Sequence, residues 1–378
     1  MGRTALACVI IAFLVSLGLA SPARAQETAV PGTCDEGQFS TGALWKICVP
    51  AAGWNHQLLV FAHGYVPNIP GVELGFYDVL PDGTELSTLV QRVGFAYATT
   101  SYRQNGLAIL EGLDDIRDLV ELFRERAGQP TRTYATGGSE GGLVTALLAE
   151  RSPDLFTGAL AACGPIGSFR FQINYFVDFR VLFDYFFPGV FTGSPIDISV
   201  QEIRDWINGS LPARIRRRLL RDREHAIELM RTSRAPHDPA DFETVVSTAL
   251  SILEYNVLAT NDARAKLGGN PFGNRSRWYS GSSDDLQLNV AVRRFAANPA
   301  AIEALHQYDT SGDLRIPLIA LHTTGDETVP FTHEGLYSLK ERPSGRGRFV
   351  LLPIRRYGHC NFTVPEILAA FGVLLAQQ

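Results

Sequence analysis

Apolar and polar residues follow two periods along this chain, and the two periods predict alternating strands and helices. Residues 57–62, 95–99 and 133–136 are short runs rich in apolar and β-branched residues, a pattern typical of buried strands. Over residues 107–127, apolar residues recur every three or four positions with charged residues between them, which predicts an amphipathic helix. Strands that alternate with helices through short connections indicate a mostly parallel α/β sheet flanked by helices.

The alternation is interrupted once, in the middle of the chain. It stops at Gly164 and resumes with the apolar segment 316–322, after which helix and strand patterns continue to the C-terminus. The intervening residues have a largely helical pattern that is broken by prolines. We therefore predict one α/β core, residues 26–164 and 311–378, with a helical cap, residues 165–310, inserted after the sixth strand.

The first 25 residues have the pattern of a secretory signal peptide. Arg3 supplies a positive charge ahead of the apolar run 5–20, and Ala23-Arg24-Ala25 is a small-x-small cleavage pattern. We expect cleavage before Gln26 and export to the periplasm or the extracellular medium. The apolar run is short for a membrane-spanning helix, so no stable membrane anchor is expected.

The composition of the chain excludes several classes of protein. With 46% hydrophobic and 19% charged residues, a chain of 378 residues can bury a core, which excludes a mainly disordered protein. A formal charge of −5 gives no general attraction to nucleic acid, so nucleic acid is not expected as a partner. The sequence does not indicate an oligomeric state.

Four cysteines remain once the signal peptide, which contains Cys8, is set aside. An even number in an oxidising compartment favours disulfides, and four cysteines allow three pairings. Cys34 and Cys48 flank a predicted hairpin, so we favour that pair, which leaves Cys163 with Cys360. Free buried thiols are the alternative.

The strongest chemical signal is Gly137-Gly138-Ser139-Glu140-Gly141, a G-x-S-x-G pattern between a predicted strand and a predicted helix. A sharp turn at such a junction presents the serine above the sheet, and small residues two positions before and after it avoid clashes. The first N–H groups of the following helix have no partner within it and attract negative charge. Ser139 is therefore the candidate nucleophile.

A serine hydroxyl needs a base to remove its proton, and the base needs an acid to orient it. His359 lies on the loop after the last predicted strand, and Asp326 lies on the loop after the preceding strand. His322 falls within an apolar strand and is expected to pack there, whereas His333, at the start of a helix, is a rival base. Glu327 is the alternative acid.

The chain order Ser139, Asp326, His359 is the order of the α/β-hydrolase fold. The predicted strand at residues 57–62 also ends in His63-Gly64. With these motifs the chain resembles the α/β-hydrolase superfamily over nearly all of its mature core. It departs from the glycine-rich loop of some lipases and esterases, because a tyrosine directly follows His63-Gly64.

The resemblance implies which groups bind the negative charge that develops on the reacting carbonyl oxygen. In that superfamily the donors are the backbone N–H groups of the residue after His-Gly and of the residue after the nucleophile, here Tyr65 and Glu140. Such chemistry requires neither a metal nor an organic cofactor. The sequence also lacks zinc-ligand spacing and glycine-rich phosphate loops, so no metal site is expected.

Three segments of the middle region bear on substrate and partners. Residues 169–191 include ten aromatic residues, which either roof an apolar substrate pocket or pack the cap itself. Residues 214–223 include six arginines, which we interpret as a solvated helix face, with an anionic polymer or membrane surface as the alternative. Residues 309–313 resemble a calcium loop only loosely and are interpreted as a turn.

Together these patterns predict a secreted serine hydrolase that cleaves small or polymeric carboxylic esters through an acyl-enzyme intermediate. A serine exopeptidase on the same fold is one alternative, because amide cleavage uses the same residues. A non-catalytic binding member of the superfamily is the other. Fold alone does not distinguish ester substrates from amide substrates.

Overall fold

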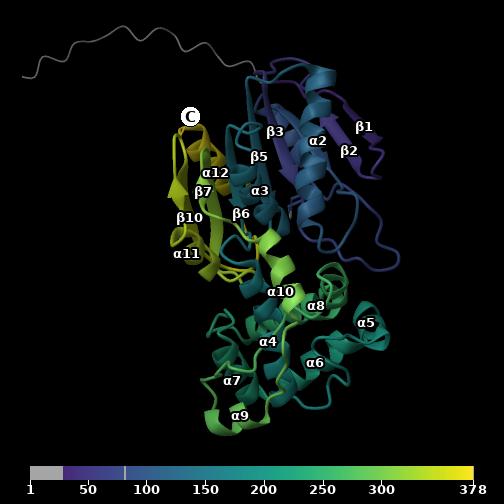
Figure 1. Ribbon diagram of the computed structural model, residues 1–378, viewed down its shortest axis with the longest axis vertical. Helices are drawn as coiled ribbons and strands as arrows, with labels where there is room; N and C mark the ends of the chain where they lie inside the picture. The colour runs from purple at the N-terminus through teal and green to yellow at the C-terminus, as the bar shows by residue number, and fades with distance from the viewer. Residues whose placement is uncertain (1–28, 81, 378) are drawn as a thin grey trace, which may run out of the picture.

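The computed structural model describes residues 29–80 and 82–377 (Figure 1). The expected signal peptide and its cleavage site lie outside the described residues. The main sheet has eight strands in the order β1-β2-β4-β3-β5-β6-β8-β10, in which β2 runs antiparallel to both its neighbours and the other pairs are parallel. The strands are β1 Cys34–Gln38, β2 Leu44–Cys48, β3 Gln57–Ala62, β4 Ala96–Thr100, β5 Arg132–Gly138, β6 Gly158–Ala162, β8 Pro317–Gly325 and β10 Arg348–Tyr357.

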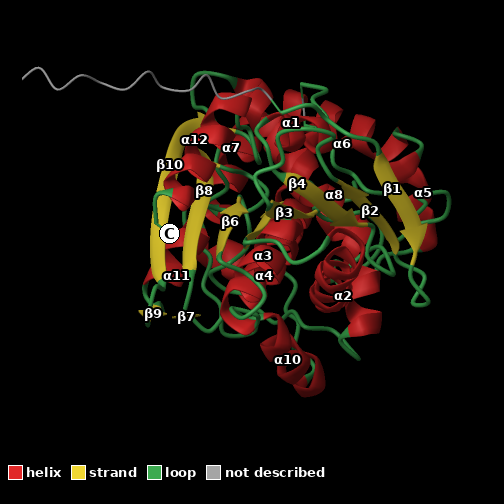
Figure 2. Cartoon of the chain, turned by 90° about the horizontal axis from the view of Figure 1, so that it is seen from above, coloured by secondary structure: helices red, strands yellow, loops and turns green. Residues whose placement is uncertain are grey.

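Different helices cover the two faces of this sheet, because successive side chains of a strand point to opposite faces. In β3, Leu58 and Val60 pack in a core shared with α2 and α3. Leu59 faces the other way, into a second core that contains residues of α1 and α12. Figure 2 shows these two pairs of helices on opposite sides of the sheet. The bounds are α1 Leu86–Arg92, α2 Ile109–Ala127, α3 Glu140–Arg151 and α12 Val364–Leu375.

The sequence periods predict the bounds of most of these elements to within a few residues. The predicted and observed bounds differ most for β10. The apolar pattern predicts a strand only near 349–352, whereas β10 extends to Tyr357. β10 is an edge strand that pairs only with β8, so its later residues are partly exposed and include charged side chains that hide the pattern. β7 (Asp313–Leu314) and β9 (Arg342–Pro343) form a separate two-stranded sheet and are too short to predict.

The segment between β6 and β7 is helical, and Figure 1 shows most of it as a second lobe below the sheet. Phe179, Phe183 and Phe187 of the aromatic-rich segment are fully buried in a core of this lobe's own. Most of the ten aromatic side chains therefore pack the lobe itself. Its helices are α4 Phe169–Phe186, α5 Val200–Ile207, α6 Ser210–Arg221, α7 Arg223–Ser233, α8 Phe242–Lys266, α9 Asp285–Ala291, α10 Pro299–Leu305 and the 3-10 helix η1 His306–Tyr308.

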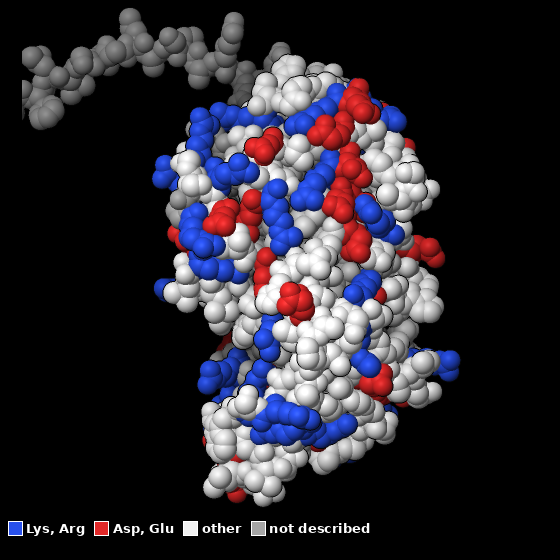
Figure 3. Space-filling view, in the orientation of Figure 1, with Lys and Arg blue, Asp and Glu red and all other residues white. Residues whose placement is uncertain are grey.

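Charged side chains of both signs are spread over the visible face of the molecule, with acidic ones gathered along α2 (Figure 3). The arginine-rich segment belongs to two helices, since Asp222 separates α6 from α7. Arg216, Arg217 and Arg218 are exposed, as expected for a solvated helix face. No helix within the described ranges is long and apolar enough to cross a membrane.

Two disulfides cross-link the core, one within a hairpin and one between distant loops. Cys34 lies directly opposite Cys48 in the β1–β2 hairpin, and these two residues form one disulfide. The second, Cys163–Cys360, joins the loop after β6 to the loop after β10 across a sequence separation of 197 residues. Both disulfides fit a protein that matures in an oxidising compartment.

Removing Cys163–Cys360 is expected to destabilise the protein more than removing Cys34–Cys48. A cross-link restricts the unfolded chain more when it closes a longer loop, which corresponds to about 5 kcal/mol for a separation of 197 and about 3 kcal/mol for one of 14. The double variants Cys163→Ser/Cys360→Ser and Cys34→Ser/Cys48→Ser are to be compared by urea unfolding monitored by circular dichroism. Equal losses, or a larger loss for the hairpin pair, would contradict the expectation.

Candidate active site

Ser139 lies on the turn between β5 and α3 in a strained backbone conformation, with φ 59° and ψ −124°. A positive φ is uncommon for a residue other than glycine. Neighbouring chain segments approach this turn too closely for side chains: a Cβ on Gly137 would collide with the carbonyl oxygens of Gly141 and Ala62. The Ser139 N–H also donates a hydrogen bond of 2.9 Å to the Ala162 carbonyl. Glycine at these positions therefore allows the turn that lifts Ser139 out of the sheet.

Ser139, His359 and Asp326 form one continuous hydrogen-bonded chain. Ser139 Oγ lies 2.9 Å from His359 Nε2, and His359 Nδ1 lies 2.8 Å from Asp326 Oδ2. The three residues follow β5, β10 and β8, and the carboxyl ends of parallel strands meet at one edge of a sheet. The Asp326 side chain is fully buried, whereas the His359 side chain is 17% exposed. The chain therefore runs from the protein interior to an accessible serine.

Asp326 is held in place and kept ionised by its surroundings. The backbone N–H groups of Thr328 and Val329 donate to Asp326 Oδ1 at 3.0 and 2.7 Å. Burial alone raises the pKa of this carboxyl, but the charges and hydrogen bonds of His359 and His322 hold it well below its usual range. An ionised Asp326 can accept the Nδ1–H of His359 and so leave Nε2 free to accept the serine proton.

His322, expected from the sequence to pack within its strand, is buried there but also contacts Asp326. Its Nε2 lies 3.3 Å from Asp326 Oδ2, and its Nδ1 lies 2.6 Å from Glu334 Oε1 on α11 (Thr332–Ser338). Burial lowers the pKa of His322, but the hydrogen bonds to the two carboxylates outweigh burial and raise it to about 10. A positive charge therefore lies behind Asp326, an arrangement that the apolar strand pattern gave no reason to expect.

The loop after β3 passes directly beside Ser139. A Cβ on Gly64 would lie 3.3 Å from the Ser139 Cβ, closer than an ordinary van der Waals contact, so glycine at position 64 eases this close approach. Tyr65 follows at once and lines a cavity together with Ser139. On the other side, Glu140 is the first residue of α3, where the helix leaves the N–H group without an internal partner. The two expected oxyanion donors therefore belong to residues that flank Ser139.

His63 supports this loop from within the protein. Its ring stacks on Tyr102 with centroids 4.0 Å apart, and the Tyr102 hydroxyl donates to the His63 carbonyl. Burial lowers the pKa of His63, so the ring is neutral at physiological pH.

The Glu140 side chain is buried near Ala108 and Lys266. It is 8% exposed, and its Oε1 accepts a hydrogen bond of 3.2 Å from the Ala108 N–H. Burial is the largest cause of a raised pKa, about 8, while the Ala108 hydrogen bond and the charge of Lys266 act in the opposite direction. Glu140 is therefore partly or fully protonated at neutral pH.

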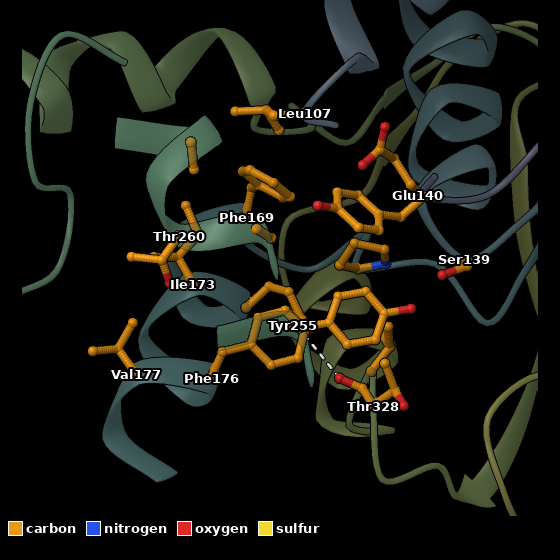
Figure 4. A pocket seen from close by; sticks show the side chains of 16 residues that line it. Leu107, Ser139, Glu140, Phe169, Ile173, Phe176, Val177, Tyr255, Thr260 and Thr328 are labelled. Atoms are coloured by element: carbon orange, nitrogen blue, oxygen red, sulfur yellow. Dashed lines mark hydrogen bonds between the residues drawn. The ribbon is translucent and has the colours of Figure 1, made fainter. Parts of the chain in front are cut away.

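A small apolar cavity of about 90 Å³, here called the cap-side cavity, lies between Ser139 and the helices α4 and α8 (Figure 4). Phe176 of α4 and Tyr255 of α8 stack face to face there, with ring centroids 4.9 Å apart. Phe176 belongs to the aromatic segment singled out in the sequence. Tyr255 was not predicted, because it stands alone in a helical pattern and nothing in the sequence marks it.

A larger cavity of about 510 Å³, here called the entrance cavity, lies beside His359. It is lined by His359 and Tyr255 and by the carboxylates of Glu254 and Glu327. Burial raises the pKa of both carboxyl groups. The walls of the entrance cavity are therefore more polar than those of the cap-side cavity.

The rival residues named from the sequence occupy other places. His333 is fully buried, with Nε2 2.8 Å from Gln172 Oε1 and Nδ1 3.2 Å from the Gly167 N–H. Glu327 lines the entrance cavity, whereas its neighbour Asp326 makes the contact with His359. His359 also lies near both sulfurs of the Cys163–Cys360 disulfide, but these are bonded to each other and offer no thiolates to a metal ion.

Glu140→Gln is expected to reduce the loss of stability that accompanies rising pH. Between pH 4.5 and about 8 the folded protein keeps a proton on Glu140 that the unfolded chain has released, so stability falls as pH rises. The slope from one proton is at most about 1.4 kcal/mol per pH unit. Urea unfolding from pH 4.5 to 8 should show a shallower decline for Glu140→Gln than for the wild type. The exposed control Glu224→Gln should follow the wild type, and parallel curves for Glu140→Gln would contradict the assignment.

Comparison with protein-family models finds no match to this chain, and comparison with curated proteins finds none either. Comparison with solved structures finds many matches at low sequence identity. An esterase of Pyrococcus furiosus matches at 10% identity and a TM-score of 0.48, covering 92% of this chain and 91% of its own. Proline iminopeptidase of Mycobacterium smegmatis matches at 14% identity and a TM-score of 0.44, covering 91% of this chain and 97% of its own.

An acylaminoacyl peptidase of Pyrococcus horikoshii matches at 11% identity and a TM-score of 0.42 over 89% of this chain, which spans only 38% of that longer protein. The fold itself is evident from the strand order with its antiparallel β2, the turn at Ser139 and the order of Ser139, Asp326 and His359 along the chain. This chain has the α/β-hydrolase fold.

Proposed function

We propose that this protein is a secreted serine hydrolase that cleaves carboxylic esters. The observation that carries the proposal is the hydrogen-bonded chain from Ser139 through His359 to Asp326, with the serine on a strained turn beside an apolar cavity. The serine, base and orienting acid each have a partner at hydrogen-bonding distance. The two disulfides support export, as does the signal-like pattern of residues 1–25.

In the proposed reaction, Ser139 Oγ attacks the ester carbonyl while His359 Nε2 takes its proton. Asp326 accepts the Nδ1–H of His359, which holds the useful tautomer and stabilises the imidazolium that forms. The backbone N–H groups of Tyr65 and Glu140 bind the oxyanion of the tetrahedral intermediate. His359 then gives its proton to the leaving alcohol, and a water molecule hydrolyses the acyl-enzyme by the same steps. No metal or organic cofactor takes part.

An exopeptidase is the second candidate, and one observation favours it. Glu254 and Glu327 bring two carboxyl groups to the entrance cavity, beside His359. Carboxylates in that position can bind the ammonium group of a peptide N-terminus. Burial raises the pKa of both groups, however, and the cavity that Ser139 itself lines has mostly apolar walls. We therefore place the ester first.

Ser139→Ala is expected to lower ester turnover by about 10⁴-fold or more, because no other nucleophile takes its place. It should also abolish covalent labelling by a fluorophosphonate, detected by mass spectrometry of the intact protein. The control Ser210→Ala changes an exposed serine at the start of α6 and should keep both properties. Full labelling of Ser139→Ala would refute the assignment, and an unreactive wild type would favour a non-catalytic binding protein.

Ester and peptide substrates can be separated by comparing kcat/KM for p-nitrophenyl acetate with kcat/KM for alanyl and prolyl p-nitroanilides. The rates at which hydroxide alone hydrolyses the ester and the anilides give their intrinsic reactivities. For an esterase, the ratio of kcat/KM for the ester to kcat/KM for the anilides should be well above the ratio of these hydroxide rates. An exopeptidase should cleave one of the anilides efficiently and lose that activity in Glu254→Gln. That pair of results would replace the ester proposal with the peptidase.

A further inference from the structure

A second apolar cavity reaches Ser139 from the opposite side, and the proposed reaction does not require it. This sheet-side channel has a volume of about 340 Å³ and runs between the sheet and the helices α1 and α12, which lie on the same face (Figure 2). Its floor consists of side chains that alternate along neighbouring strands: Leu59, Phe61, Leu160 and Ala162. Its roof consists of apolar side chains of the two helices, among them Leu86, Val90, Ile367 and Phe371.

The channel opens directly onto the reacting groups. Ser139 and His359 both line it, next to the Cys163–Cys360 disulfide. A Cβ on Gly138 would meet only the two disulfide sulfurs, each at 3.9 Å, which is ordinary van der Waals contact. Gly138 therefore does not obstruct the end of the channel beside Ser139, and the disulfide lies at that end.

The walls of the channel suit a hydrocarbon and little else. None of the described residues that line it is Asp, Glu, Lys or Arg. Thr136, one of its few polar lining residues, already donates its hydroxyl to the Leu160 carbonyl. A sugar or a peptide would leave its polar groups without hydrogen-bond partners there, which disfavours binding.

The size of the channel distinguishes it from the cap-side cavity. An apolar cavity of about 150 Å³ holds one benzene molecule. The sheet-side channel, at about 340 Å³, is more than twice that size, whereas the cap-side cavity, at about 90 Å³, is smaller. The channel is also elongated: Leu59 pairs with Tyr134, five residues before Ser139, which corresponds to about 16 Å of strand.

The far end of the channel reaches the surface. Val93 and Leu368, which line it, are 43% and 38% exposed. Both also line a shallow surface hollow between the end of α1 and α12. A chain longer than the channel could therefore continue outward instead of meeting a closed end.

We propose that the sheet-side channel binds a linear hydrocarbon chain of the ester substrate, so that this protein prefers esters of medium-length or long chains. The inference rests on the proposed ester hydrolysis for its kinetic consequence, but not for binding itself. The chain can belong to the acyl part or to the alcohol part, since both meet at the carbonyl carbon beside Ser139. The cap-side cavity then takes a small group on the other side of that carbon.

The test uses two series of esters: p-nitrophenyl esters from acetate to laurate, and alkyl acetates from ethyl to dodecyl. In one of the series kcat/KM should rise with chain length, by at most about fourfold for each methylene group buried. The series that shows the rise identifies the part of the substrate in the channel. Rates that are flat or falling in both series would overturn the proposal.

Two matched substitutions show which cavity holds the chain. Ala162→Leu fills the sheet-side channel, and Ala259→Leu makes the same change in the cap-side cavity. In the responsive series, Ala162→Leu should lower the ratio of kcat/KM for the C12 ester to that for the C2 ester by tenfold or more. Ala259→Leu should leave this ratio unchanged, whatever it does to the individual rates. Equal effects, or the reverse order, would overturn the proposal.

A second variant and a binding measurement separate failure of this inference from failure of the proposed function. Leu368→Trp narrows the outer end of the channel. Position 368 is partly exposed on a helix, so the protein should still fold with tryptophan there. This variant should reduce turnover of the C12 ester more than turnover of the C6 ester.

Calorimetry with dodecanoate and the Ser139→Ala protein measures binding to the channel without catalysis. Binding that is lost in Ser139→Ala/Ala162→Leu and kept in Ser139→Ala/Ala259→Leu would support the channel even if no ester is hydrolysed. Absence of dodecanoate binding together with unchanged ratios would reject it.

Discussion

The close approach of β5, α3 and β3 at Ser139 is the constraint on which the rest of the site depends. A positive φ at a serine persists only where the surroundings enforce it, and here the missing side chains of Gly137, Gly141 and Gly64 let three chain segments converge. The same convergence exposes the serine hydroxyl at the edge of the sheet where β8 and β10 end and the loops that carry Asp326 and His359 begin. This turn thus places Ser139 next to the candidate base His359 and the candidate oxyanion donors Tyr65 and Glu140.

The burial of Asp326 determines which charged and polar groups must surround it. Asp326 is fully buried, and a buried carboxylate is stable only with close partners, here two backbone N–H groups and the rings of His359 and His322. On the other side of the His322 ring, Glu334 Oε1 lies 2.6 Å from Nδ1. The Cys163–Cys360 disulfide holds the loop that carries His359 against the loop after β6. This bond restrains the position of the His359 loop relative to the sheet.

The central strands, the turn at Ser139 and helix α3 could be predicted from the sequence, because each depends on a local pattern. The period-two runs identified the central strands, and β5, a G-x-S-x-G turn and α3 follow one another within twenty residues. Edge strand β10 was underestimated because charged residues on its exposed side mask its period. The ten aromatic residues at 169–191 left two interpretations open, and the structure divides them: Phe179, Phe183 and Phe187 pack the second lobe, while Phe176 faces the cavity beside Ser139.

By itself, the sequence determined the fold class, the order of the candidate residues and the four cysteines available for pairing. Only the tertiary structure decided which side chains meet: His322 with Asp326, Tyr255 with Phe176, and a channel between α1, α12 and the sheet. The physical reason is the range of the interactions. Strand and helix periods are set by neighbours a few residues apart, whereas the cavities and the site bring together residues of separate elements, such as Phe176 and Tyr255, 79 positions apart, and Ser139 and His359, 220 positions apart. No local pattern records those distances.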